Sequence, residues 1–282
     1  MKLYFAIALL CMSSISHSQQ IHLYSHFVIA PKISDHIKQS SSMDIEYHIS
    51  STNPRLMERE AAKEENSMIL TSLFSQVSSK NPTTEFEVFG ILTYQAFAIV
   101  IKKNSPFDTF EQLAVHARKI NRPILLGGTM TNSLCDHAGN ILSAKYGIPI
   151  THVTYKSGIE STADVLLDRI DIRCSFGKDI IDTVVVSEQL KILGSFSRFT
   201  DGPLKNSIVI LPIDNAQIML VNKKMKPEVR QKLKDVITSK IFKDSLYSLE
   251  KTNLIYLRAA FDESEILNET KFILKDYGYR HE

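Results

Sequence analysis

A run of small and hydroxyl-bearing residues, Gly127–Ser133 (GGTMTNS), separates a short apolar segment from an amphipathic helix and is the stretch best suited to binding a ligand. Its polar members are of the types that cap helix N-termini: Thr129, Thr131, Asn132 and Ser133. Ser133 with Asp136 also fits a capping box. The free N–H groups and the dipole at such a helix start favour an anion. The run therefore predicts an anion site, although a capped helix without a ligand fits the same pattern.

Side chains that could catalyse a reaction or hold a metal are few. Cys135 and His137 are two residues apart, so on a helix they point about 200° away from each other, which is the wrong geometry for a Cys–His pair. His22 and His26 share one face of a strand, but no further ligand lies nearby in the sequence. We therefore expect no catalytic residue, no metal site and no cofactor.

The segments around this run alternate between strands and helices with short connections. This order predicts a parallel sheet with helices on its faces, and ligands of such sheets bind at the carboxyl ends of the strands. Gly147 and Pro149 end the first of the helices. The expected strands are 124–126, 152–155 and 170–176, and the expected helices run from about 134 to 146 and from about 159 to 168.

Residues that follow two of these strands are expected to share the site. Gly127 and Gly128 would allow a tight turn, because glycine reaches backbone angles closed to other residues. Tyr155 and Ser157 come at the end of the next strand and would line the same wall.

Four segments in order resemble the substrate-binding receptors of tripartite tricarboxylate transporters, periplasmic proteins of the Bug type. They are VFGILTYQAFAIVIKKNSPFDTFEQLAVHARK, GGTMTNSLCDHAGNILSAKYGI, HVTYKSGIESTADVLLDRIDI and QLKILGSFSR. The resemblance covers roughly Phe89 to Arg198. Two glycine-rich turns of that family are absent here, where the sequence reads FVIAPKISDHI and SSTNPRL.

The resemblance implies an α/β protein with the two-lobed type II periplasmic-binding fold, in which each lobe is a mostly parallel sheet flanked by helices. The ligand cleft lies between the lobes. The first lobe would supply the opposing wall of the site from Ile29–Ser34, including Ala30. Asp171 resembles an aspartate of the family, and a simple turn cap fits it equally well.

Each lobe can be assigned expected limits. Lobe one would comprise 19–102 and 220–282, and lobe two would comprise 103–219. Gly90–Ile101 is extended and apolar, which suits a strand that crosses from one lobe to the other. Two lobes also fit the length, which exceeds what one modest core requires.

The ends and the composition point to an exported protein. Met1–Lys2, the apolar run Leu3–Met12 and the small residues Ser16 and Ser18 predict a signal peptide over 1–18 and a periplasmic location. A net charge of +2 with interspersed signs gives no reason to expect a nucleic-acid partner. We expect a monomer.

Two cysteines remain after removal of 1–18. Cys135 falls at a helix start and Cys174 in a strand. Since a disulfide requires a specific separation of its Cα atoms, these placements favour two unpaired thiols, and pairing is left open.

Together, the residues and the resemblance favour a non-enzymatic receptor for a small organic carboxylate of the di- or tricarboxylate class. Such a receptor would deliver its ligand to integral membrane transporter subunits or to a sensor kinase ectodomain. The alternative is a binding-protein fold that has lost its ligand and acts as a protein-interaction or sensor-accessory domain. The missing glycines of the first lobe motivate that alternative.

Overall fold

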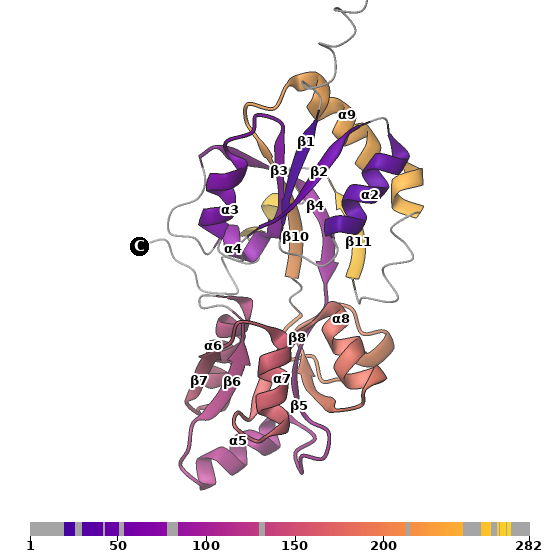
Figure 1. The fold of residues 1–282 in the computed structure, drawn as a ribbon. Helices are drawn as coiled ribbons and strands as arrows, with labels where there is room; N and C mark the ends of the chain where they lie inside the picture. Colours follow the sequence, from indigo (N-terminus) through magenta and orange to yellow (C-terminus); the bar gives the residue numbers. More distant parts are fainter. Residues whose placement is uncertain are drawn as a thin grey trace, which may run out of the picture.

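The computed structural model describes residues 20–25, 30–41, 43–50, 54–77, 84–129, 133–212, 215–244, 255–260, 264, 266–268 and 270–271. The expected signal peptide, His26, Thr131 and Asn132 lie outside these ranges. In the part of the chain so described, no helix is both long and apolar enough to cross a membrane. The chain forms two lobes, each built on one sheet, and Figure 1 shows the lobe that contains β1 above the lobe that contains β6.

The first lobe is built on a mixed six-stranded sheet with the order β11-β4-β10-β3-β1-β2. β2, β1 and β3 are parallel, whereas β10 runs antiparallel to both β3 and β4, and β11 runs antiparallel to β4. The strands are β1 (Ile21–Ser25), β2 (Ile45–Ile49), β3 (Ser67–Ser72), β4 (Phe86–Gln95), β10 (Asn215–Asn222) and β11 (Ile255–Ala260).

Helices cover both faces of this first sheet. Successive side chains of β1 point to opposite faces, so Ile21 and Leu23 enter one core cluster while Tyr24 enters the other. The first cluster includes side chains of α2 (Ala30–Ser40) and α9 (Pro227–Thr238), and the second those of α3 (Pro54–Ala61) and α4 (Leu73–Val77). α9 begins at Pro227 and buries one apolar face through four residues: Val229, Leu233, Val236 and Ile237.

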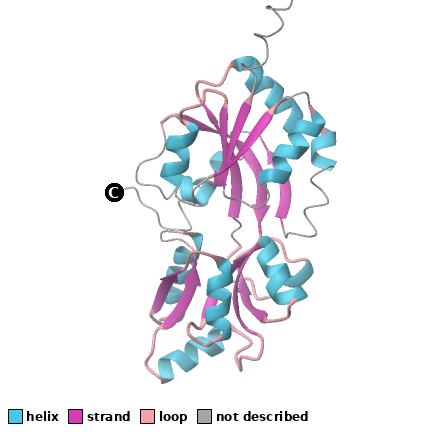
Figure 2. Ribbon diagram, in the orientation of Figure 1, coloured by secondary structure: helices cyan, strands magenta, loops and turns pink. Residues whose placement is uncertain are grey.

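The second lobe is built on a five-stranded sheet with the order β7-β6-β8-β5-β9. β7, β6 and β8 are parallel, as the strand–helix alternation predicts, and β5 runs antiparallel to β8 and β9. The strands are β5 (Phe97–Lys102), β6 (Ile124–Gly128), β7 (Ile150–Thr154), β8 (Ile172–Phe176) and β9 (Leu190–Ser195). The helices, cyan in Figure 2, are α5 (Phe110–Lys119), α6 (Leu134–Tyr146), α7 (Gly158–Leu166), α8 (Gly177–Ile180), the π-helix η1 (Ile181–Val186) and the 3-10 turn η2 (Gly202–Leu204).

The chain passes from the first sheet to the second at Ala96. We expected this crossing near residue 102, but Phe97–Lys102 already pairs with β8 and β9. The Ala96 carbonyl accepts the Gly177 N–H at 2.9 Å, and the Phe97 ring stacks on Phe176, which explains the early change of sheet. On the return, Asn215–Asn222 lies wholly in the first sheet, whereas we expected the return at 220.

The two-lobed α/β architecture is thus confirmed, and two local features were not expected. Each sheet is mixed, because the strands that link the lobes run against their neighbours. β11 was not indicated by the sequence pattern.

Candidate functional site

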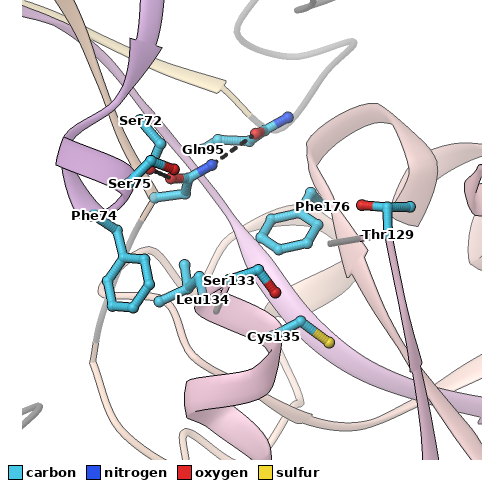
Figure 3. Close-up of a pocket in the computed structure, with 10 residues that line it drawn as sticks. Ser72, Phe74, Ser75, Gln95, Thr129, Ser133, Leu134, Cys135 and Phe176 are labelled. Atoms are coloured by element: carbon cyan, nitrogen blue, oxygen red, sulfur yellow. Dashed lines mark hydrogen bonds between the residues drawn. The ribbon is translucent and has the colours of Figure 1, made fainter. Parts of the chain in front are cut away.

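A cavity of about 200 Å³ lies between the two lobes, with lining residues from both. Figure 3 shows the first-lobe side chains Ser72, Phe74 and Ser75 facing the start of helix α6 across the cavity. Gln95 and Asn215, on the strands that link the lobes, also line the cavity. The cavity therefore sits where closure of the lobes would change its size.

The first-lobe wall comes from the end of β3 and the turn into α4. Ser72 is the last residue of β3 and donates its hydroxyl to Asn215 Oδ1 at 2.7 Å. Phe74 and Ser75 follow in α4. β3 is buried along its whole length, so this wall is anchored in the core of the first lobe.

An amide network continues from this wall along the linking strands. Gln95 Oε1 accepts from Asn215 Nδ2 at 3.4 Å and from Gln217 Nε2 at 3.2 Å. Thr93 donates to Gln217 Oε1 at 2.7 Å. The antiparallel register places Asn215 opposite Gln95 and Gln217 opposite Thr93, so neighbouring strands bring these side chains together. The network presents neutral polar groups at the base of the cavity.

The second-lobe wall is the N-terminus of α6. Ser133 is the N-cap, and its hydroxyl oxygen accepts the Asp136 N–H at 3.4 Å, as predicted. The reciprocal half of the expected capping box does not form, because the Asp136 carboxylate lies 2.6 Å from His152 Nδ1. Leu134 and Cys135 are the first helical residues, line the cavity, and carry N–H groups without partners inside the helix.

A disulfide joins Cys135 to Cys174, so the expectation of unpaired thiols is wrong. Their Cα atoms are 5.9 Å apart although the residues are 39 positions apart in the sequence. β6 and β8 are adjacent parallel strands, and α6 follows β6 directly, so the first turn of α6 comes to lie over β8. The bridge fixes the helix start that forms the second-lobe wall.

Gly127 and Gly128 serve packing rather than turn geometry. Both lie in β6, and neither has the positive φ that we expected them to supply. A Cβ on Gly128 would lie 2.4 Å from His152 Nε2 and 2.9 Å from Cys135 Sγ, and one on Gly127 would lie 2.5 Å from Ile170 Cδ1. The strand end therefore needs glycine, because side chains of the neighbouring strand, of α6 and of the turn before β8 occupy the space that a Cβ would fill.

Of the nine sequence-predicted site residues, Thr129 and Ser133 line the cavity, and Gly128 is buried directly before Thr129. Thr131 and Asn132 fall outside the described residues. Tyr155 turns towards α7, where its hydroxyl donates to Asp164 Oδ2 at 2.8 Å. Burial and this hydrogen bond raise the pKa of Tyr155 to about 12.

The remaining three predicted residues lie elsewhere. Ser157 is the N-cap of α7 and accepts the Glu160 N–H at 3.3 Å. Asp171 bonds the Leu125 N–H at 2.8 Å and pairs with Arg122, at the end of the sheet where β8 begins. Ala30 is fully buried at the start of α2 in the first-lobe core. None of these three lines the cavity described here.

Phe74 and His137 make a contact across the lobes. Their ring centroids are 5.8 Å apart, with Phe74 on α4 and His137 on α6. Burial lowers the pKa of His137 to about 4, so its imidazole is neutral at pH 7. The pair adds an apolar contact beside the cavity.

The described cavity lining contains no Asp, Glu, Lys, Arg or His side chain. Its polar groups are hydroxyls, amides and the N–H groups of the α6 N-terminus. Such a site holds an anion by hydrogen bonds and helix dipole rather than by an ion pair. Ser72, Gln95, Asn215 and Phe176 were missed by sequence reasoning, since no local spacing links residues so far apart in the chain.

Comparison with known proteins agrees with this architecture. No protein-family model matches the chain. A segment of 93 residues, 33% of this chain, is 29% identical to the UPF0065 protein in the TAR-I ttuE-ttuC' intergenic region of Agrobacterium vitis. The chain covers only 27% of that relative's length.

Solved structures extend the comparison to nearly the whole chain. The crystal structure of a TctC solute-binding protein from Polaromonas, without ligand, matches with a TM-score of 0.64 and 15% identity, over 91% of this chain and 97% of that one. MatC from Rhodopseudomonas palustris, with bound malate, matches with a TM-score of 0.73 and 10% identity, over 92% and 99%. The chain has the fold of the tripartite tricarboxylate receptor proteins. This match confirms the two-lobed fold that the resemblance implies.

Proposed function

We propose that this chain is an extracytoplasmic receptor for a small organic carboxylate of the di- or tricarboxylate class. It would reach the periplasm after removal of 1–18 and pass its ligand to integral membrane transporter subunits or to a sensor kinase ectodomain. It would act by binding alone, without catalysis. The receptor fold and the malate bound to MatC support this function.

The observation that carries the proposal is the cavity between the lobes against the N-terminus of α6. Its volume of about 200 Å³ is below the roughly 300–1,000 Å³ typical of pockets for drug-sized ligands. A cavity of this size suits a ligand with few carbon atoms. Neutral donors concentrated at a helix start suit a carboxylate.

In the proposed binding mode, one carboxylate lies at the start of α6. It accepts from the N–H groups of Leu134 and Cys135 and from the hydroxyls of Thr129 and Ser133. The Ser133 hydroxyl can do both tasks, because its oxygen accepts from Asp136 while its hydrogen remains free to donate. The amides of Thr131 and Asn132 belong to the same proposed cradle.

The rest of the ligand faces the first-lobe wall. Ser72, Ser75 and Gln95 offer hydroxyl and amide groups on that side. A second carboxylate or a hydroxyl on the ligand would bond there and so connect the two lobes. Closure about the linking strands would then follow from ligand contacts to both walls.

Calorimetry on two matched variants tests this function. Ser133→Ala and Ser157→Ala each remove the N-cap hydroxyl of a lobe-two helix, but only Ser133 lines the cavity. We expect the mature protein to bind a member of a panel of di- and tricarboxylates, malate included. A lost charge-assisted hydrogen bond, about 1.5–3 kcal/mol, should weaken binding at least roughly tenfold in Ser133→Ala. Ser157→Ala should bind like the wild type.

Two results would count against the proposal. Equal loss of affinity in both variants would show a general effect of the missing caps. If no carboxylate binds the wild type at millimolar concentration, the receptor function fails and the protein-interaction alternative takes its place.

A further inference from the structure

A second cluster of chemically capable side chains lies in the first lobe, away from the cavity. His22 on β1 and Glu46 and His48 on β2 direct ligand atoms to one point, and these atoms all lie within 4.8 Å of one another. None of the three lines the cavity between the lobes. No partner for His22 could be found from local spacing, because its neighbours Glu46 and His48 lie on the adjacent strand β2. His26 lies outside the described residues.

The parallel pairing of β1 with β2 assembles the cluster. His22 lies opposite Glu46, and Tyr24 lies opposite His48. Residues two apart on a strand share a face, so all four side chains lie on the face of the sheet that α3 covers, with Tyr24 in the core cluster of Met57 and Ala61. The ligand atoms are thus held by two hydrogen-bonded strands.

The separations of the donor atoms suit one metal ion. His22 Nδ1 and His48 Nε2 are 3.0 Å apart. Two imidazole nitrogens bound to one tetrahedral zinc, each about 2.0–2.1 Å from the metal, lie roughly 3.3 Å from one another. The Glu46 carboxylate approaches both rings, with oxygens 3.6 Å from His22 Nδ1 and 4.0 Å from His48 Nε2.

The surroundings orient both rings for this role. The His48 ring stacks on Tyr24 with centroids 4.5 Å apart and planes 14° apart. Glu64 Oε2 lies 3.9 Å from His22 Nε2, the nitrogen that points away from the cluster. A carboxylate there favours the proton on Nε2 and leaves the Nδ1 lone pair for a metal, as at many histidine metal sites.

The local charge also favours a cation. The Glu46 carboxylate lies 3.6 Å from His22 Nδ1, and the Glu64 carboxylate lies 3.9 Å from His22 Nε2. Two carboxylates therefore lie beside the pair of imidazole rings. Two imidazoles with a carboxylate are ligands that suit zinc and other divalent first-row transition metals rather than calcium or magnesium.

We propose that His22, Glu46 and His48 form a binding site for a divalent transition metal of the zinc class on the first lobe. Water completes the coordination, since Glu46 is exposed. The metal joins β1 to the edge strand β2 and stabilises the first lobe by binding the folded state. A hydrogen bond between the two rings would use the same 3.0 Å separation, so metal binding itself is the decisive measurement.

Calorimetry of zinc chloride into mature, tag-free protein stripped of metal tests the site. The wild type should take up one equivalent with an affinity that EDTA reverses, and zinc should raise its Tm. His48→Phe keeps a ring to stack on Tyr24 but removes both nitrogens, and His22→Gln removes the other imidazole. Each should weaken zinc binding at least tenfold, and Glu46→Gln should weaken it less. Cobalt should give visible d–d absorption in the wild type and not in His48→Phe.

His116→Ala is the matched control, because His116 is an exposed histidine on α5 in the other lobe. It should bind zinc like the wild type. Circular dichroism and Tm without metal establish that each variant is folded. The proposal is overturned if folded His48→Phe and His22→Gln bind zinc as tightly as the wild type, or if the wild type binds none at micromolar free zinc.

Discussion

Cys135 and Cys174 join the first turn of α6 to β8, the central strand of the second sheet, across 39 positions of sequence. A crosslink that closes a loop of this length removes freedom from the unfolded chain. We expect the double variant Cys135→Ala/Cys174→Ala to lose roughly 2–5 kcal/mol of unfolding free energy. Urea denaturation measures this, and wild type kept in reductant should show a similar loss. Two free thiols in the untreated, denatured mature protein would contradict the bridge.

In the ion pair of Arg173 with Asp179 the guanidinium is buried, so breaking this pair should cost far more stability than breaking a surface pair on the same helical segment. The Arg173 side chain is 4% exposed and lies 2.7 Å from Asp179. We expect Asp179→Ala to cost about 3–5 kcal/mol, because it leaves a buried guanidinium without its counterion. Chemical denaturation gives the value.

Asp182→Ala provides the control for this comparison. Asp182 pairs with Lys178 four residues earlier, and both side chains are about half exposed. Such pairs contribute about 0.3–0.5 kcal/mol. Equal losses in the two aspartate variants would refute the importance assigned to burial.

Acid should destabilise the protein through His137. Its folded pKa is about 4, below the ordinary value of roughly 6.5. The unfolded chain therefore binds the proton more tightly, so stability is complete above about pH 6.5 and is lost as the pH falls towards 4. This difference in pKa corresponds to at most about 3.5 kcal/mol of unfolding free energy.

The measurement is unfolding free energy against pH for His137→Gln and for His116→Gln. The difference in unfolding free energy between the wild type and His137→Gln should change as the pH falls from 6.5 to 4. His116→Gln, which changes an exposed histidine, should follow the wild type throughout. A parallel pH dependence for all three proteins would be evidence against a buried, neutral His137.

Gly128→Ala should destabilise the second lobe without any involvement of ligand. The new methyl group would lie 2.4 Å from His152 Nε2 and 2.9 Å from Cys135 Sγ. Overpacking of this kind costs about 1–3 kcal/mol. Thermal unfolding in the absence of ligand measures the loss, and an unchanged Tm would contradict the close packing described here.

The second lobe could be predicted largely from local sequence. The alternation of β6, α6, β7, α7 and β8 follows from apolar periodicity, and Gly147 ends α6 with a φ of 62°, as a helix-stopping glycine should. Ser133 could also be predicted as an N-cap from local sequence, because capping links residues only three apart.

The other half of the cavity could not be found in this way. Ser72 meets Asn215 across 143 positions, and Gln95 meets Gln217 across 122. These contacts depend on strand order and register, which local patterns do not specify. The Cys135–Cys174 bridge depends likewise on which strands are neighbours, and Tyr155 was misplaced because the direction of its side chain depends on Asp164 in the following helix.

The position of β10 in the first sheet has a consequence for how the protein is made. β10 lies between β3 and β4, so residues 215–222 fill the middle of a sheet whose other inner strands end at residue 95. A ribosome completes every strand of the second lobe before it reaches β10, and until then β3 and β4 have no partner between them. The first sheet therefore cannot be completed early in synthesis. The second lobe can fold as one continuous segment, whereas the first sheet is completed only when β10 and then β11 have been made.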